Sequence, residues 1–116
     1  MKNIFLISLL FLLSGFVLDD DIKTRGIALV QYNAKFNESN SYNDIKKVRD
    51  VKLLNLWIDD DASLKSEEGI RSVPTMILYK NGKEIKRWEA GLSLSLDVPY
   101  LEIQKEVDKL TGANKF

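Results

Sequence analysis

The chain has 116 residues, a length that suits one domain with one hydrophobic core. Its 17 basic and 17 acidic residues balance, so the composition gives no electrostatic argument for a nucleic-acid or anionic-membrane partner. The chain contains neither cysteine nor histidine, which excludes thiol chemistry and disulfide bonds and removes the commonest zinc ligands and the usual general base.

The N-terminus has the pattern of a secretory signal. Lys2 precedes an apolar stretch, residues 4–13, and small residues follow this stretch. The apolar stretch is shorter than the roughly twenty residues that a membrane-spanning helix needs. We therefore predict that residues 1–18 are a signal peptide or an N-terminal anchor and that residues 19–116 form the domain. The alternative is that the first residues fold into the domain as a strand and a helix.

Two apolar runs further along the chain predict strands. Residues 27–32 and residues 51–58 each contain several successive apolar residues, a pattern that suits strands covered on both faces. Three aspartates close the second run, and residues 62–68 can form a short helix after them.

A helix is predicted between these two strands. Tyr42, Ile45 and Val48 recur at three-residue spacing, which we interpret as the buried face of that helix. Ser39 or Ser41 is the expected N-terminal cap.

The firmest local prediction is a β-hairpin. Residues 75–79 and 84–89 are strand-like, and the pair Asn81-Gly82 between them favours a type I′ turn. Pro74 has no amide hydrogen to give to a strand ladder, so we expect it at the first residue of its strand or in the loop before it. Basic residues around the hairpin fit the protection of an edge strand, namely Lys80, Lys83, Lys86 and Arg87.

The last predicted element is a helix that Asp97 caps, with Pro99 in its first turn. Four apolar residues line one face of this helix: Tyr100, Ile103, Val107 and Leu110. Thr111-Gly112 ends it. The order of elements is strand, helix, strand, helix, hairpin, helix, which predicts an α/β sheet with helices on both faces.

The second half of the chain has a distinctive order of residues. In this order stand Ile70-Arg71, Val73-Pro74-Thr75, an apolar strand, Lys80-Asn81-Gly82, a second strand and Gly91. The order resembles the C-terminal half of the thioredoxin family, in which that proline is cis and faces the active site. The resemblance implies a thioredoxin-like three-layer sandwich whose mixed central sheet ends in an antiparallel hairpin.

The segment VQYNAKFNESN, residues 30–40, resembles the strand end and active-site loop of the same family. Phe36 matches the aromatic residue that precedes two cysteines, and Asn37 and Asn40 stand at the cysteine positions. Thiol–disulfide exchange needs a thiolate to attack a sulfur, and asparagine supplies neither thiolate nor leaving group. We therefore expect no oxidoreductase activity, no catalytic residue, no cofactor and no metal.

Two further positions of the family's site are changed in this chain. By alignment, Gln31 replaces a buried acid and Asn55 replaces a lysine that assist proton transfer to the cysteines. Buried charges without a catalytic use are costly, so neutral amides suit a version of the fold that lacks the chemistry.

The resemblance implies a surface for an extended peptide beside the proline. In this chain we expect the peptide to contact Phe36, Val73, Pro74, Gly91 and Leu92, partly by strand addition. The leading hypothesis is an exported, redox-inactive protein that binds another polypeptide, with no nucleic acid and with a membrane contacted only through the N-terminal segment. The alternative is a cytoplasmic, phage- or host-encoded accessory subunit of a larger enzyme.

Other candidate sites have ordinary explanations. The acidic residues 59–61 with 67–68 lack the spacing of a calcium loop and suit a solvated turn. Asn37-Glu38-Ser39 fits the N-glycosylation pattern, which is common by chance. Trp57 and Trp88 are interpreted as packing residues rather than as sugar or base platforms.

Overall fold

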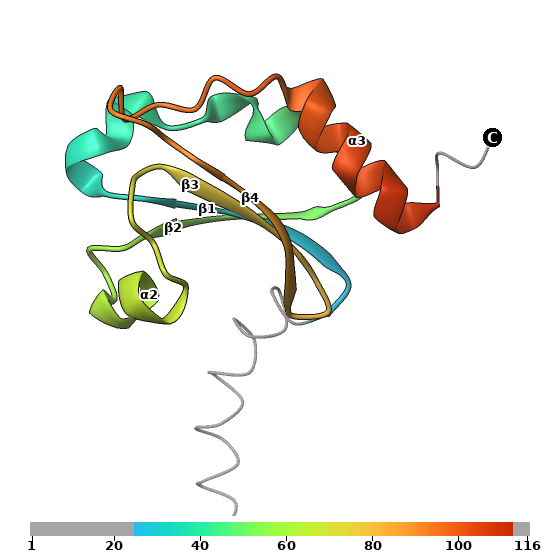
Figure 1. Ribbon diagram of the computed structural model, residues 1–116, viewed down its shortest axis with the longest axis horizontal. Coiled ribbons are helices and arrows are strands. Elements are labelled where there is room, and N and C mark those ends of the chain that lie inside the picture. The colour runs from blue at the N-terminus through green and yellow to red at the C-terminus, as the bar shows by residue number, and fades with distance from the viewer. Residues whose placement is uncertain (1–24, 113–116) are drawn as a thin grey trace, which may run out of the picture.

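The computed structural model describes residues 25–112 and is organised around a four-stranded sheet. Its strands are β1 (Ile27–Asn33), β2 (Lys52–Trp57), β3 (Thr75–Lys80) and β4 (Lys83–Glu89). Their order in the sheet is β2-β1-β3-β4, with β1 and β2 parallel and the other two pairings antiparallel (Figure 1). The predictions of a signal peptide or anchor at 1–18 lie outside the described residues.

Helical segments cover both faces of this sheet. The 3-10 helices η1 (Lys35–Asn40) and η2 (Asn43–Lys47) lie with α3 (Tyr100–Thr111) over one face, and α2 (Ala62–Glu67) lies over the other (Figure 1). This arrangement is the predicted three-layer α/β sandwich with a hairpin at one side. Within the described residues no helix combines the length and apolar character needed to cross a bilayer.

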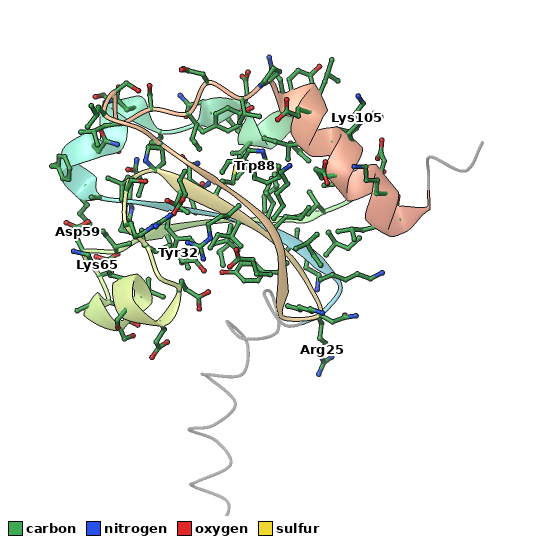
Figure 2. The ribbon with its side chains drawn as sticks, viewed as in Figure 1. Arg25, Tyr32, Asp59, Lys65, Trp88 and Lys105 are labelled. Carbon is green, nitrogen blue, oxygen red and sulfur yellow. The ribbon has the colours of Figure 1, made fainter. Side chains whose placement is uncertain are left out.

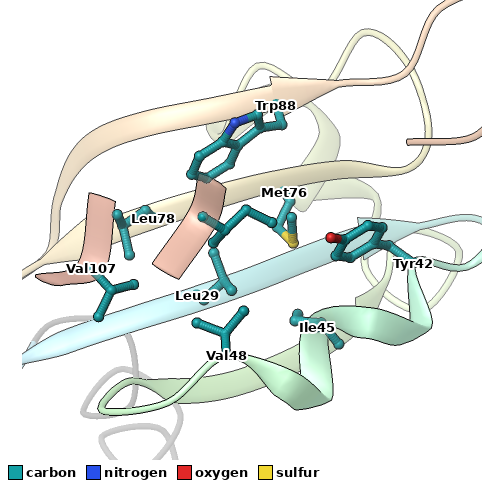
Figure 3. Packing of buried hydrophobic residues seen from close by; sticks show 9 residues of the cluster. Leu29, Tyr42, Ile45, Val48, Met76, Leu78, Trp88 and Val107 are labelled. Carbon is teal, nitrogen blue, oxygen red and sulfur yellow. The ribbon is translucent and has the colours of Figure 1, made fainter. Parts of the chain in front are cut away.

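The strand alternation of β1 and β3 divides the apolar side chains between two cores. Leu29, Met76 and Leu78 point to the face covered by η2 and α3, where Trp88 joins them (Figure 3). Val30, Tyr32, Ile77 and Tyr79 point to the opposite face, toward α2. Both central strands are therefore buried on both faces, as their apolar runs predict. The packing role predicted for Trp88 is confirmed, since it is buried in the first core.

The turn of the predicted hairpin has the expected backbone. Asn81 and Gly82 both have positive φ, 51° and 84°, as a type I′ turn requires. The Asn81 side chain accepts a hydrogen bond from the Gly26 amide, and the Asn81 amide donates to the Gly26 carbonyl, both at 2.8 Å. The turn is thus attached to the residue that leads into β1.

The predicted helix around Tyr42, Ile45 and Val48 is wrong in type. These side chains are buried as expected, but the backbone forms η1 and η2, separated by Ser41 and Tyr42, of which Tyr42 is extended. A 3-10 helix has three residues per turn, which fits the three-residue spacing better than the α-helical period. Neither helix has a side-chain cap, so Ser39 and Ser41 do not act as predicted.

The start of α3 also differs from the prediction. Pro99 is the N-cap with an extended backbone, ψ 140°, and the helix begins at Tyr100 without a side-chain cap. Asp97 therefore lies outside the helix and does not cap it. The C-terminal end is as predicted, because Gly112 has a left-handed backbone with φ 82°.

β2 departs from the prediction of a strand buried on both faces. Its partner among the described strands is β1 on one side, so β2 lies at an edge of the sheet. Three of its six residues are exposed and the other three, among them Trp57, are half-buried. Consecutive apolar residues therefore do not distinguish this edge strand from a central one.

A buried chain of hydroxyl groups ties β1 and β3 to the end of α2. The Tyr32 and Tyr79 hydroxyls lie 2.9 Å apart, and Tyr79 donates to the Glu68 carboxylate at 2.6 Å. Because Tyr79 gives its single proton to Glu68, Tyr32 must donate to Tyr79. Burial, the largest cause, raises the pKa of Tyr32 to about 12 and also raises the pKa of Tyr79.

These raised pKa values predict a loss of stability in alkali. A tyrosine whose pKa is about 10 in the unfolded chain and about 12 when folded favours folding fully below pH 10 and progressively less as the pH rises through 12. Tyr32→Phe should remove about 2 kcal/mol of this alkaline loss by pH 12. Urea unfolding at several pH values measures it.

Tyr100→Phe is the control, because it leaves the Tyr32–Tyr79 pair intact. Its unfolding free energy should fall with rising pH as steeply as that of the native protein. If the unfolding free energy falls equally with rising pH in the native protein and in Tyr32→Phe, the assignment of this loss to Tyr32 is contradicted.

Candidate functional site

The loop after β1 is organised by an asparagine that the sequence analysis did not single out. The buried Asn33 amide oxygen accepts hydrogen bonds from the Ala34 amide at 2.9 Å and from the Asn37 side chain at 3.1 Å. Its amide nitrogen donates to the Asn37 carbonyl and to the Ser41 hydroxyl. Its position as the polar last residue of a mainly apolar strand is the signal that marks it.

Asn37, at one predicted cysteine position, is the centre of a larger network. Its side chain is 2% exposed, and its amide nitrogen lies within hydrogen-bond distance of Asn33 Oδ1, the Val73 carbonyl at 3.3 Å and the Leu94 carbonyl at 3.0 Å. Two N–H groups are thus shared among three acceptors. Asn40, at the other cysteine position, donates to Asn37 Oδ1 at 2.8 Å.

Asn37 therefore joins three loops that are far apart in the sequence. Val73 lies before β3, next to Pro74, and the peptide bond between them is cis. Leu94 lies in the loop after β4, in a turn closed by its amide on the Gly91 carbonyl at 3.0 Å. Leu94 has φ 58°, a conformation uncommon for leucine, and its carbonyl points at Asn37.

The burial of Asn37 also bears on whether the Asn37-Glu38-Ser39 pattern can accept a sugar in the folded protein. The amide nitrogen that would carry the sugar faces the interior and is hydrogen-bonded. In the folded protein this pattern does not present an acceptor at the surface.

A second amide pair, Gln31 and Asn55, stands at the positions that the resemblance assigns to proton-transfer groups. Gln31 and Asn55 are register partners on β1 and β2, and the Gln31 amide nitrogen donates to Asn55 Oδ1 at 2.9 Å. Gln31 also accepts from the Tyr42 amide at 2.7 Å and donates to the Tyr42 carbonyl at 3.2 Å. A carboxylate in place of the Gln31 amide could accept the hydrogen bond from the Tyr42 amide. It could not donate to Asn55 or to the Tyr42 carbonyl.

An open groove of about 650 Å³ lies beside the Asn37 network. Four of the five predicted peptide-contacting residues line it, namely Phe36, Val73, Gly91 and Leu92. The Phe36 side chain is 75% exposed and Leu92 is fully exposed, so the groove presents two large apolar groups to solvent.

Two of the expected peptide contacts are less accessible than the others. Pro74 is fully buried and is not part of the groove lining. Val73 lines the groove but is nearly buried in the core on the α2 side, and its carbonyl already accepts the Asn37 amide. Strand addition through that carbonyl would have to share it with Asn37.

Two cationic side chains also line the groove. Arg71 binds Glu89 through two nitrogen atoms, at 2.7 and 3.4 Å, and this hydrogen bond holds the pKa of Glu89 below its usual range. Lys65, on α2, has no ion pair within residues 25–112 and its side chain is exposed (Figure 2). The groove is therefore mainly apolar with positive charge at its side.

The acidic turn after β2 has structural partners. Asp61 caps α2 by accepting from the Ser63 amide at 3.0 Å, Asp59 accepts from the Lys35 amide at 2.8 Å, and Asp60 pairs with Lys35 Nζ at 2.8 Å. In the part of the chain that the structure describes, no three acidic residues come together as a metal site.

The thioredoxin family model matches residues 22–96 of this chain. Thioredoxins from Rickettsia felis and Rickettsia bellii are similar in sequence, 50% identical over 34 residues and 47% identical over 42 residues. These matches cover 29% and 36% of this chain. The chain spans 32% and 39% of the length of these two curated relatives.

Solved structures extend the likeness of the fold over most of the chain. A mutant thioredoxin from Halobacterium salinarum has a TM-score of 0.63 at 18% identity, covering 79% of this chain and 80% of its own. Thioredoxin 1 from Thermosipho africanus has a TM-score of 0.59 at 13% identity, covering 77% and 99%. At these identities the likeness concerns the fold alone.

The Asn37 network predicts a strong effect of one isosteric change. In Asn37→Asp the two N–H donors become a carboxylate oxygen facing the Val73 and Leu94 carbonyls, which should cost about 3 kcal/mol of unfolding free energy at pH 7. The pKa of the new carboxyl would be raised in the folded state, so stability should recover as the pH falls toward about 4. Urea unfolding at the two pH values measures both effects.

Asn40→Asp is the control for this change. Asn40 is exposed, so a carboxylate there stays hydrated and should cost about 1 kcal/mol or less. An Asn37→Asp protein as stable as the native one at pH 7 would show that the donors of Asn37 do not hold the three loops.

Proposed function

Because the chain belongs to the thioredoxin family, we propose that it is a redox-inactive member that works by binding an extended segment of another polypeptide. The absence of cysteine removes the nucleophile and the leaving group of thiol–disulfide exchange. The place of the cysteines is filled by Asn37 and Asn40, whose hydrogen bonds stabilise the loop without supplying chemistry.

The observation that carries this proposal is the apolar groove next to Asn37. Phe36 and Leu92 both line it and expose large apolar surfaces, and exposed apolar surface of this kind is typical of binding sites. A partner that covers both side chains would gain from removing them from water, at about 25 cal/mol per Å² of apolar area.

The contacts around the groove favour recognition through side chains. The Val73 carbonyl is already bonded to Asn37, so main-chain pairing there is weakened. Apolar side chains of the bound segment would contact Phe36 and Leu92. Lys65, which has no ion pair within residues 25–112, would favour an acidic residue in the same segment over a basic one, whereas Arg71 is already paired with Glu89.

We further propose that the protein is exported, on the evidence of Lys2 and the apolar stretch 4–13. The binding site needs no thiol and no cofactor, so its function would not depend on the redox conditions of the compartment in which the protein works.

Substitutions at the groove test the binding proposal. Phe36→Ser combined with Leu92→Ser should weaken binding of a fluorescently labelled, unfolded model polypeptide with alkylated cysteines by about tenfold or more, since about 1.4 kcal/mol of apolar contact is lost. Fluorescence anisotropy measures the affinity. Alkylation ensures that the binding observed does not involve thiols.

Leu101→Ser is the matched control. Leu101 is 63% exposed on α3, does not line the groove, and should not alter binding when changed. If Leu101→Ser weakens binding as much as the groove variant does, the polypeptide binds elsewhere and the proposal fails.

Export has a separate test. Leu9→Arg with Leu10→Arg breaks the apolar stretch, so a reporter fused after Asp21 should remain in the cytoplasm instead of crossing the membrane. The same fusion with Ser14→Ala serves as a control that keeps the stretch intact. A native fusion that stays in the cytoplasm would favour the accessory-subunit alternative.

A further inference from the structure

The two edges of the sheet differ in how they are protected against pairing with another chain. The edge strand β4 has a register shift opposite Leu78 and Tyr79 that leaves Ile85 as an extra residue, and Lys83, Glu84 and Lys86 are exposed along it. Bulges and charges of this kind hinder the addition of a further strand. The β4 edge is therefore poorly suited to pairing.

Within residues 25–112, the edge strand β2 has no such protection. Its pairing with β1 is regular over six residues, and the sequence from Leu53 to Ile58 contains no charge, proline or glycine. Leu53 is 37% exposed and Trp57 is half-buried. A regular, apolar and uncharged edge is a ready template for another strand.

The residues on either side of β2 carry opposite charges. Residues 46–52, before and at the start of the strand, contain four basic residues and one acidic residue. Residues 59–61, after the strand, are three aspartates. In two antiparallel copies of β2 the basic start of each strand lies beside the acidic end of the other, whereas parallel pairing would bring like charges together.

These flanking charges have bonding capacity left for a partner. Asp59, Asp60 and Asp61 use Oδ1 in their contacts within residues 25–112, and a carboxylate has a second oxygen. On the basic side, the Arg49 side chain is exposed, and the hydrogen bonds of Arg49 to Gln104 involve its backbone.

We propose that two copies of this chain associate by antiparallel pairing of their β2 strands, forming one continuous sheet. The contact is self-complementary, as a two-fold dimer requires, because each copy offers both the basic start and the acidic end of the strand. It lies at the edge of the sheet opposite to the β4 hairpin and does not use the groove at Phe36 and Leu92 (Figure 1).

A pair of matched substitutions tests this proposal on the full chain in mild detergent. Leu53→Lys places a charge on the β2 edge, and Ile85→Lys places the same charge on the β4 edge at a site of similar exposure, 40% against 37%. Leu53→Lys should raise the dimer dissociation constant by about tenfold or more, whereas Ile85→Lys should leave it unchanged. Sedimentation equilibrium measures the constant, and circular dichroism checks that both variants fold.

Cross-linking gives a second measurement. The chain has no native cysteine, so an introduced cysteine is the only thiol that can react. Asn55→Cys lies near the middle of β2 and should give a covalent dimer with a short bis-maleimide, whereas Ile85→Cys should not. High salt should weaken the dimer because the flanking ion pairs are exposed.

A monomer at micromolar concentration would overturn the proposal, and it is the result expected if the chain's own N-terminal residues pair with β2. A dimer that survives Leu53→Lys would also overturn it, because the interface would then lie elsewhere, for example in the apolar stretch 4–13.

Discussion

The hydrogen bonds of the Asn37 side chain join three segments that flank paired strands at one end of the sheet. They reach the end of β1 through Asn33, the segment before β3 through Val73, and the segment after β4 through Leu94. Val73 and Leu94 also line the groove, and Phe36 is the neighbour of Asn37 in the chain. The shape of the candidate binding surface therefore depends on one buried amide, because a donor lost there leaves carbonyl groups unpaired in the interior.

Neutral amides stand at the positions that the resemblance assigns to the family's catalytic site. Gln31 and Asn55 bind one another and the Tyr42 backbone, and Asn37 and Asn40 bind one another and the loops around them. An amide both donates and accepts, so it can satisfy neighbouring backbone groups that a thiol or a carboxylate would leave without a partner. The amides at this site thus stabilise the loops by hydrogen bonds, and the groove lies beside them.

Sequence reasoning predicted the fold well where a local rule acts alone. The turn at Asn81-Gly82 needs positive φ at both residues, and the C-terminal end of α3 needs a left-handed residue, which Gly112 supplies. It failed where the outcome depends on neighbours. The apolar run in β2 does not reveal that one side of the strand lacks a partner among the described strands. Two partners of the Asn37 side chain, the Val73 and Leu94 carbonyls, come from segments that the sequence alone does not bring together.

The amide networks have a consequence for how the surface responds to its surroundings. Asn33, Asn37, Asn40, Gln31 and Asn55 carry no proton that titrates near neutrality and no atom that a cellular oxidant converts reversibly. Neither deprotonation near neutrality nor a change of redox conditions therefore alters the donors and acceptors in these networks. Occupancy of the groove would then be independent of the redox potential, in contrast to a thiol site, whose state reports the redox potential around it.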